Sequence, residues 1–403
     1  MIHMNAIMSH RGLLLASKKN LQVLVCGAGI NVSAVVNVYD EAFNVIFTLA
    51  QSNVYSVYSV VFSNDAKYMA VSYHVPANAS SPGFRVYRTS DWSIIITGPN
   101  VGSTDIYTHE LCFSPDGTRL FITASGYYFK VYDTNSGVVI ATPELEGNGI
   151  LPNQIYCTAS FHGGNRIVVG GFNYYNSSRS ICVIDMVTLS VVASLSHNGA
   201  SSKTIVCTPN DEYIISGGDD GTLRFYETYA SYAQTGAYTP PTTGYGPNGL
   251  AISPDSTKIA LARYNSSTGL HAQETYLIGA NPWNLLLQNT VTIDTLSYGQ
   301  SWSVKGTLLG SSLDGKVRRA SDFVMEGSVP TSGWKSLQFV PDPLYFSPPP
   351  FKVASAIVAQ APVYVIERPA NALTLSQAPV YVIEQPANAL TLSQAPIYVI
   401  QGV

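Results

Sequence analysis

Residues that could do acid–base or metal chemistry are few in this sequence, and they lie far apart. Seven histidines stand at positions 3, 10, 74, 109, 162, 197 and 271. His109, His162 and His197 could converge on one face if the chain closed into a ring, and imidazoles gathered in that way bind metal ions or act as general bases. Their spacing matches no metal-binding motif, so we expect three separate loop residues.

The sequence also lacks the motifs of the common catalytic and cofactor-binding sites. It has no Gly-x-Ser-x-Gly elbow, no His-Glu-x-x-His motif and no phosphate-binding loop. Gly27-Ala28-Gly29 lacks the third glycine of a dinucleotide fingerprint, and Asp219-Asp220-Gly221 reads as a hairpin turn rather than a calcium loop. We therefore predict no catalytic residue, no cofactor and no metal, and a protein that acts by binding rather than as an enzyme.

The composition points in the same direction. Charged residues make up only 11% of the chain, against about 25% in an average soluble protein, whereas tyrosine occurs 26 times. The formal net charge of −4 argues against nucleic-acid binding. No apolar run has the length of a signal peptide or a membrane span, so we expect a chain made in a cytoplasm without membrane insertion. The five cysteines lie in apolar runs and are predicted to be small buried hydrophobic residues.

A repeat of about 45 residues supplies the elements that would carry any site. Its clearest copy, residues 108–141, contains four short β-type runs separated by turn signals such as Pro115-Asp116-Gly117. The third run of each copy ends in a short apolar or aromatic motif, as in Val86-Tyr87-Arg88 and Val131-Tyr132-Asp133. Four strands in about 40 residues are typical of one blade of a β-propeller.

The copies predict an all-β fold, a seven-bladed β-propeller, with six or eight blades as alternatives. The expected blades lie near residues 12–50, 55–101, 105–150, 153–200, 201–243, 246–292 and 295–330. Either residues 334–341 or the N-terminal segment would supply the strand that closes the ring. We expect a propeller over 1–342, a proline-rich linker over 343–359 and a repeat tail over 360–403.

The blade sequences resemble a known class of propellers. Residues 113–141 and 181–195 carry the pattern Phe-Ser-Pro-Asp-Gly-Thr-x-Leu-Phe-Ile-Thr followed by Val-Tyr-Asp or Val-Ile-Asp, which is similar to YVTN-type and WD40-like repeats. The Gly-His and Trp-Asp pairs of WD40 repeats are absent. The resemblance implies the fold but no particular function, because propellers serve as enzymes, scaffolds and receptor-binding heads.

The C-terminal part repeats every 17 residues. Residues 360–376 recur at 377–393 with Gln385 in place of Arg368, and a third copy begins at Gln394. Each copy offers two short strands bracketed by prolines, which limit strand length. We expect the tail to dock by strand addition or by pairing with other copies of itself. The residues expected to anchor it are Val363, Tyr364, Val365, Ile366, Leu373, Leu375, Val380, Tyr381 and Ile383.

The Leu373-Thr374-Leu375 to Ala378-Pro379 pattern of this tail resembles repeats in virion proteins of tailed bacteriophages. The resemblance implies a virion structural protein, a tail, fibre or head-decoration component made in the host cytoplasm. Its partners would be other virion proteins, copies of itself, and a glycan or protein of the host surface. The expected contact loops contain Phe172, Tyr174, Tyr175, Tyr229, Tyr232, Tyr238 and Tyr245. A propeller enzyme of the lactonase or lyase type and a cellular protein-interaction scaffold are the alternatives.

Overall fold

The structure of the protein is a computed structural model in which the chain forms two compact units, Met1–Ser347 and Pro348–Val403. The predicted boundaries at 342 and 359 remain predictions. The structure describes residues 24–30, 33–39, 42–54, 56–75, 82–98, 108–124, 128–141, 154–172, 180–198, 200–240, 245–265, 271–279, 281–293, 299–303, 305–311, 316–328, 337–340, 364–367, 374–375 and 398–400. Over these residues, no helix is long and apolar enough to cross a membrane.

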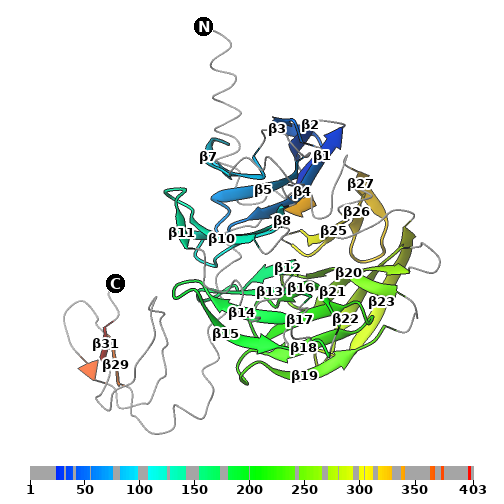
Figure 1. The fold of residues 1–403 in the computed structure, drawn as a ribbon. Coiled ribbons are helices and arrows are strands. Elements are labelled where there is room, and N and C mark those ends of the chain that lie inside the picture. Colours follow the sequence, from blue (N-terminus) through cyan, green and yellow to red (C-terminus); the bar gives the residue numbers. More distant parts are fainter. Residues whose placement is uncertain are drawn as a thin grey trace. The chain divides into compact units, whose positions relative to one another are not determined.

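The first unit is a ring of seven four-stranded antiparallel sheets, so the predicted propeller is confirmed (Figure 1). Blade 1 contains β28 (Leu337–Phe339), β1 (Leu24–Ile30), β2 (Ser33–Tyr39) and β3 (Val45–Ser52). Blade 2 contains β4 (Ser56–Phe62), β5 (Tyr68–His74), β6 (Phe84–Arg88) and β7 (Ile94–Thr97). Blade 3 contains β8 (Thr108–Phe113), β9 (Arg119–Ala124), β10 (Tyr128–Asp133) and β11 (Val139–Ala141).

The remaining blades follow in chain order. Blade 4 contains β12 (Gln154–Ser160), β13 (Arg166–Phe172), β14 (Ile181–Asp185) and β15 (Ser190–Leu195). Blade 5 contains β16 (Ser202–Cys207), β17 (Tyr213–Gly218), β18 (Leu223–Glu227) and β19 (Ala233–Tyr238). Blade 6 contains β20 (Tyr245–Ile252), β21 (Lys258–Asn265), β22 (His271–Ile278) and β23 (Leu285–Ile293). Blade 7 contains β24 (Gln300–Trp302), β25 (Leu308–Ser311), β26 (Lys316–Arg319) and β27 (Met325–Ser328).

Both ends of the propeller segment contribute to blade 1, which closes the ring. Strand β28 pairs with β1 in antiparallel register, with Leu24 opposite Phe339 and Cys26 opposite Leu337. Figure 1 shows the orange β28 beside the blue β1. This confirms the closing strand expected within residues 334–341. Closure matters because β1 would otherwise be an unpaired sheet edge.

The position of a strand within its blade explains its sequence pattern. The first strands of successive blades contact one another around the ring, and the fourth strands form its outer rim. Second strands lie between two neighbouring blades, so β5 and β13 are buried at five consecutive positions. The outer strand β15 instead alternates between exposed and half-buried residues. Continuous apolar runs therefore mark inner strands, and alternation marks the rim.

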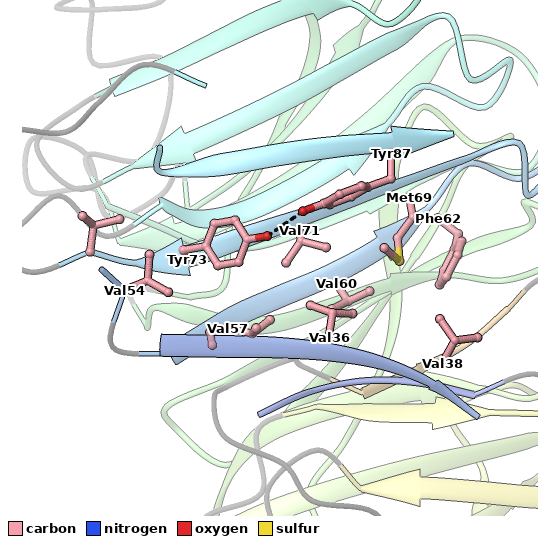
Figure 2. Packing of buried hydrophobic residues seen from close by; sticks show 12 residues of the cluster. Val36, Val38, Val54, Val57, Val60, Phe62, Met69, Val71, Tyr73 and Tyr87 are labelled. Atoms are coloured by element: carbon pink, nitrogen blue, oxygen red, sulfur yellow. Dashed lines mark hydrogen bonds between the residues drawn. The ribbon is translucent and has the colours of Figure 1, made fainter. Parts of the chain in front are cut away.

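Apolar side chains fill the spaces between adjacent blades. Figure 2 shows the cluster between blades 1 and 2, in which Val36 and Val38 pack against Val60, Phe62 and other residues of β4 and β5. The hydroxyls of Tyr73 and Tyr87 lie 3.1 Å apart in this cluster and share a hydrogen bond, so each buried hydroxyl has a partner.

Four cysteines belong to the same buried interior. Their thiols are buried and form no disulfide, as the sequence predicted for Cys112, Cys157, Cys182 and Cys207. The side chain of Cys26 lies outside the described residues.

The turn between the first and second strands carries the repeated Ser-x-Asp motif. In blade 3, Ser114 Oγ donates a hydrogen bond to Asp116 Oδ1 at 2.5 Å and accepts one from the Arg119 backbone N–H at 3.0 Å. Blades 2 and 6 repeat the contact through Ser63 and Ser253, each donating to the aspartate two residues later. The predicted turn at Pro115-Asp116-Gly117 is therefore confirmed, and side-chain hydrogen bonds hold it and its counterparts in blades 2 and 6.

The second unit contains a three-stranded sheet with the order β30-β29-β31. Strand β29 spans Tyr364–Glu367, β30 spans Thr374–Leu375, and β31 spans Tyr398–Ile400. Strand β29 pairs antiparallel with β30, which belongs to the same repeat copy, and parallel with β31, which belongs to the third copy.

Candidate binding face of the propeller

Five of the first strands carry a β-bulge at an equivalent place. In blades 2 to 6 the register with the second strand skips one residue. The residues skipped are Tyr58, His109, Tyr156, Lys203 and Asn248. Bulges turn a side chain away from the regular pleat and are frequent next to functional sites. Repetition in five consecutive blades makes this the most regular departure from ideal sheet geometry on the inner strands.

The five bulges lie at one end of the ring. Each bulge residue precedes by five positions the residue that opens the first turn of its blade, as Tyr58 precedes Ser63 and Lys203 precedes Thr208. All first strands point toward the same end of the ring. The bulge residues therefore lie together at the other end, where these strands begin. We call this end the start face and the opposite end, which carries the Ser-x-Asp turns, the turn face.

The side chains on the start face suit recognition of another molecule. Tyr156, Lys203 and Asn248 are half-buried, whereas Tyr58 is buried. The Lys203 ammonium lies 4.0 Å from the centroid of the Tyr156 ring, a cation–π contact worth about 0.5–1 kcal/mol. Burial, and then the charge of Asp219, raise the pKa of Tyr156, so its hydroxyl stays protonated and can donate a hydrogen bond.

The surroundings of the Lys203 ammonium show what it could bind. No carboxylate forms an ion pair with its ammonium among the residues placed by the structure. A half-buried ammonium held by one aromatic ring can still accept an anionic or carbonyl partner. The start face therefore offers an aromatic ring with a charged donor beside it.

The three histidines considered from the sequence do not form a common site. His162 follows the first strand of blade 4 on the turn face, where its backbone N–H donates to Asp211 Oδ1 at 2.7 Å. His197 lies in the connection between blades 4 and 5 on the start face, and the His109 side chain lies outside the described residues. No group of three or more potential metal ligands occurs in the described part of the chain.

His197 instead has a structural role in blade 5. Its ring is fully buried, and Arg224 Nη1 donates to Nδ1. Because arginine only donates, Nδ1 must accept, and Nε2–H then donates to the Ser216 carbonyl oxygen at 3.3 Å. Burial, and then the Arg224 charge, lower the pKa of His197, in agreement with a neutral ring. Arg224 also donates to Asp220 Oδ2 at 2.6 Å, which ties the ring to the predicted hairpin turn.

The tyrosines predicted to form contact loops lie in several different places. Phe172 is half-buried at the start-face end of β13, whereas Tyr229 is 45% exposed in a connection on the turn face. Tyr238 is half-buried and packs edge-on against Tyr276. Tyr245 lies in β20 with no described side-chain surroundings, and Tyr174 and Tyr175 lie outside the described residues.

The prediction for Tyr232 is wrong. This ring is only 8% exposed and packs in the core between blades 4 and 5, where its hydroxyl accepts a hydrogen bond from Arg166 Nη1 at 2.6 Å. Ser231 and Tyr232 both have positive φ, 56° and 61°, so the chain turns sharply before β19. Tyrosine density along a loop does not reveal such a turn.

The tail residues predicted as anchors are partly described. Tyr364, Val365 and Ile366 lie in β29, and Leu375 lies in β30. The others lie outside the described residues: Val363, Leu373, Val380, Tyr381 and Ile383.

A comparison with protein families finds a match in blades 4 and 5. Residues 190–227 match the family model described as "WD domain, G-beta repeat". The chain is a β-propeller, and this segment is similar to a WD40 repeat. One similar solved structure is the β-propeller domain of Cps50 (Swd1) from Myceliophteria thermophila, with a TM-score of 0.53 and 10% sequence identity over 73% of this chain and 92% of that chain. At this identity the likeness concerns the fold alone. No curated protein sequence matches the chain.

The WD40 repeat includes the His197 network. It runs from β15 through β18, so it contains His197, Ser216, Asp220 and Arg224. The third strand ends in Tyr226-Glu227, and the Tyr226 hydroxyl donates to the Ser196 carbonyl oxygen at 2.6 Å. The network thus fixes the connection between blades 4 and 5 at the edge of the start face.

Proposed function

We propose that this protein is a structural component of a bacteriophage virion, in which the propeller binds another virion protein and the tail repeats anchor it to the particle. The binding role rests on the five bulges at equivalent positions on the start face. The Tyr156–Lys203 pair lies among them. The virion assignment draws on the near-identical tail repeats and the low charge of the chain. Other partners would be copies of itself and a glycan or protein of the host surface.

The rim of the propeller supports a place inside an assembly. Each large apolar residue found exposed in the described part of the chain lies on a fourth strand or in the turn that leads into it. These residues are Val45, Ile94, Val138, Val139, Ile140, Val187, Val192, Tyr229, Leu286, Leu287, Val324 and Met325. Val138, Val139 and Ile140 are consecutive, and contiguous exposed apolar residues are typical of surfaces that contact other molecules. A particle that packs propellers beside other subunits would cover them.

The location in a particle can be tested directly. Particles from the source culture are banded in a density gradient, and each fraction is probed with an antibody against this chain. The proposal expects the chain to band with the particles and to remain there after a salt wash. Recovery of the chain only in the particle-free fraction would contradict the virion role and favour a cellular scaffold.

The binding role of the start face can be tested by substitution. Lys203→Met keeps much of the stem volume but removes the ammonium, and we expect at least tenfold weaker retention on particles stripped of this protein. Lys305→Met is the matched control, because Lys305 is exposed beside the Gly306 turn on the turn face. Equal retention of both variants would show that the start face is not the contact surface.

A further inference from the structure

The sheet of the second unit pairs one repeat copy with another in a defined register. Tyr364, Val365 and Ile366 of the first copy lie opposite Tyr398, Val399 and Ile400 of the third copy, in parallel orientation. The offset is 34 residues, which is twice the 17-residue repeat. Each residue therefore lies opposite its own counterpart, as in stacks of identical strands.

The same sequence is present in every copy of the tail. Residues 381–383 of the second copy are also Tyr-Val-Ile, and a second molecule carries all three copies again. The backbone hydrogen bonds and side-chain types offered to β29 are therefore the same whether the partner strand belongs to the same chain or to another one. Only the effective concentration of the partner strand distinguishes the two pairings.

That concentration can be estimated from the connecting segment. A segment of 31 residues separates Ile366 from Tyr398, and a random coil of that length would have a mean end-to-end distance of roughly 30 Å. Such a tether gives an effective concentration on the order of 1 mM. Internal pairing therefore prevails in dilute solution, whereas pairing between chains prevails where neighbouring tails are held at a higher local concentration.

We propose that the repeat tail is a strand-exchange element whose partner is the repeat tail of a second copy of this chain, paired in parallel and in register by whole 17-residue repeats. This inference deepens the proposed function, because it rests on the tail as an assembly element and names its partner. Particle assembly would supply the local concentration that converts internal pairs into pairs between chains. The near-identity of the copies is then a requirement, because any copy must fit any other.

The test uses the full chain with nitroxide labels on single cysteines. The variants Val365→Cys and Val399→Cys are prepared with Cys26→Ser, since the other four cysteines are buried. Equal amounts of the two singly labelled chains are mixed from about 10 μM to about 2 mM, a range that brackets the effective concentration. We expect dipolar broadening of the spectrum that rises with concentration and reaches half its maximum near 1 mM.

Two controls make the result decisive. The chain that carries both labels should show broadening at every concentration. The mixture of Val365→Cys with Ile400→Cys, one residue out of register, should show clearly weaker broadening, because neighbouring residues point to opposite faces of a sheet. The proposal is overturned if the mixture stays unbroadened at the highest concentration or if the out-of-register pair broadens equally. Either result is independent of whether the chain bands with particles, so failure of the virion role would be recognised separately.

Discussion

At the scale of single residues, burial decides which polar groups are structural. His197 and the Arg263–Glu274 pair are almost completely buried, and each has hydrogen-bond partners inside the protein. Lys203 and Tyr156, by contrast, are half-buried and meet each other through a ring face. Sequence alone ranks the histidines first as candidates for chemistry. The structure makes Lys203 and Tyr156 the better candidates for binding. The neighbouring blade buries His197, Arg263 and Glu274, whereas it leaves Lys203 and Tyr156 partly exposed.

The neutral state of His197 predicts a pH-dependent stability. Its pKa is lowered in the folded protein, so the unfolded chain binds a proton more readily. The stabilising contribution is complete above the unfolded pKa of about 6.5 and is lost as pH falls toward the lower folded pKa. We expect the free energy of unfolding to fall by about 1.4 kcal/mol for each pH unit over which only the unfolded state gains this proton.

Urea denaturation at several pH values between 5 and 7.5 measures this effect. His197→Gln removes the titrating group but keeps an amide donor and an acceptor, so its stability should depend less on pH in this range. Part of the dependence should remain, because burial also lowers the pKa of His271. Identical pH profiles for the two proteins would show that His197 is not the group responsible.

The buried pair formed by β21 and β22 of blade 6 gives a second prediction at this scale. Arg263 contacts both carboxylate oxygens of Glu274 at 2.9 Å, and the Tyr276 hydroxyl donates to Glu274 Oε2 at 2.6 Å. Glu274→Ala leaves an arginine charge buried, so we expect a loss of about 3–5 kcal/mol. The double variant Arg263→Met with Glu274→Leu should lose less than the single variant. Thermal melting of the wild type and the two variants would decide, and a double variant at least as destabilised as Glu274→Ala would contradict this account.

At the scale of elements, turns were predictable from the sequence and bulges were not. The Ser-x-Asp turns and the third-strand endings depend on local chemistry, so the expected blades agree closely with the observed strands. A bulge depends on the register between two strands, and Tyr58, Tyr156 and Lys203 carry no local signal of it. Their constant distance from the turn is the signal that could have found them. Tyr232 was misjudged for a related reason, because backbone geometry sets its direction.

The turn of blade 3 yields a prediction about glycine. Gly117 has a φ of 69°, and a Cβ added there would lie 3.3 Å from Ser63 Cβ of blade 2. Gly117→Ala should therefore lower the free energy of unfolding by about 1–2 kcal/mol, because an L-residue is strained at this φ and the contact is tight. Gly246→Ala is the control, since a Cβ there meets nothing within 4 Å. Equal denaturation midpoints for the two variants would contradict this account.

At the scale of the whole molecule, ring closure couples the two ends of the propeller segment. The contact depends on a short strand, β28, whose Leu337 and Phe339 are buried with Tyr39 and Val317 in the cluster that joins blades 7 and 1. Every blade is held between two neighbours, so opening this junction would expose a face on each side of it. The stability of the ring should therefore depend on a few residues more than 280 positions from their partners in β2.

Truncating one of these residues tests that dependence. Phe339→Ala should destabilise the propeller by about 3–5 kcal/mol, the usual effect of removing a buried phenylalanine. Gln338→Ala, at the half-buried position between the two core residues, should change stability by less than about 1 kcal/mol. If closure couples the ring, fluorescence and circular dichroism should report one shared unfolding transition that moves as a whole in Phe339→Ala. A separate early transition with the remaining blades unchanged would instead mean that blade 1 unfolds locally and that the other six sheets are stable without closure.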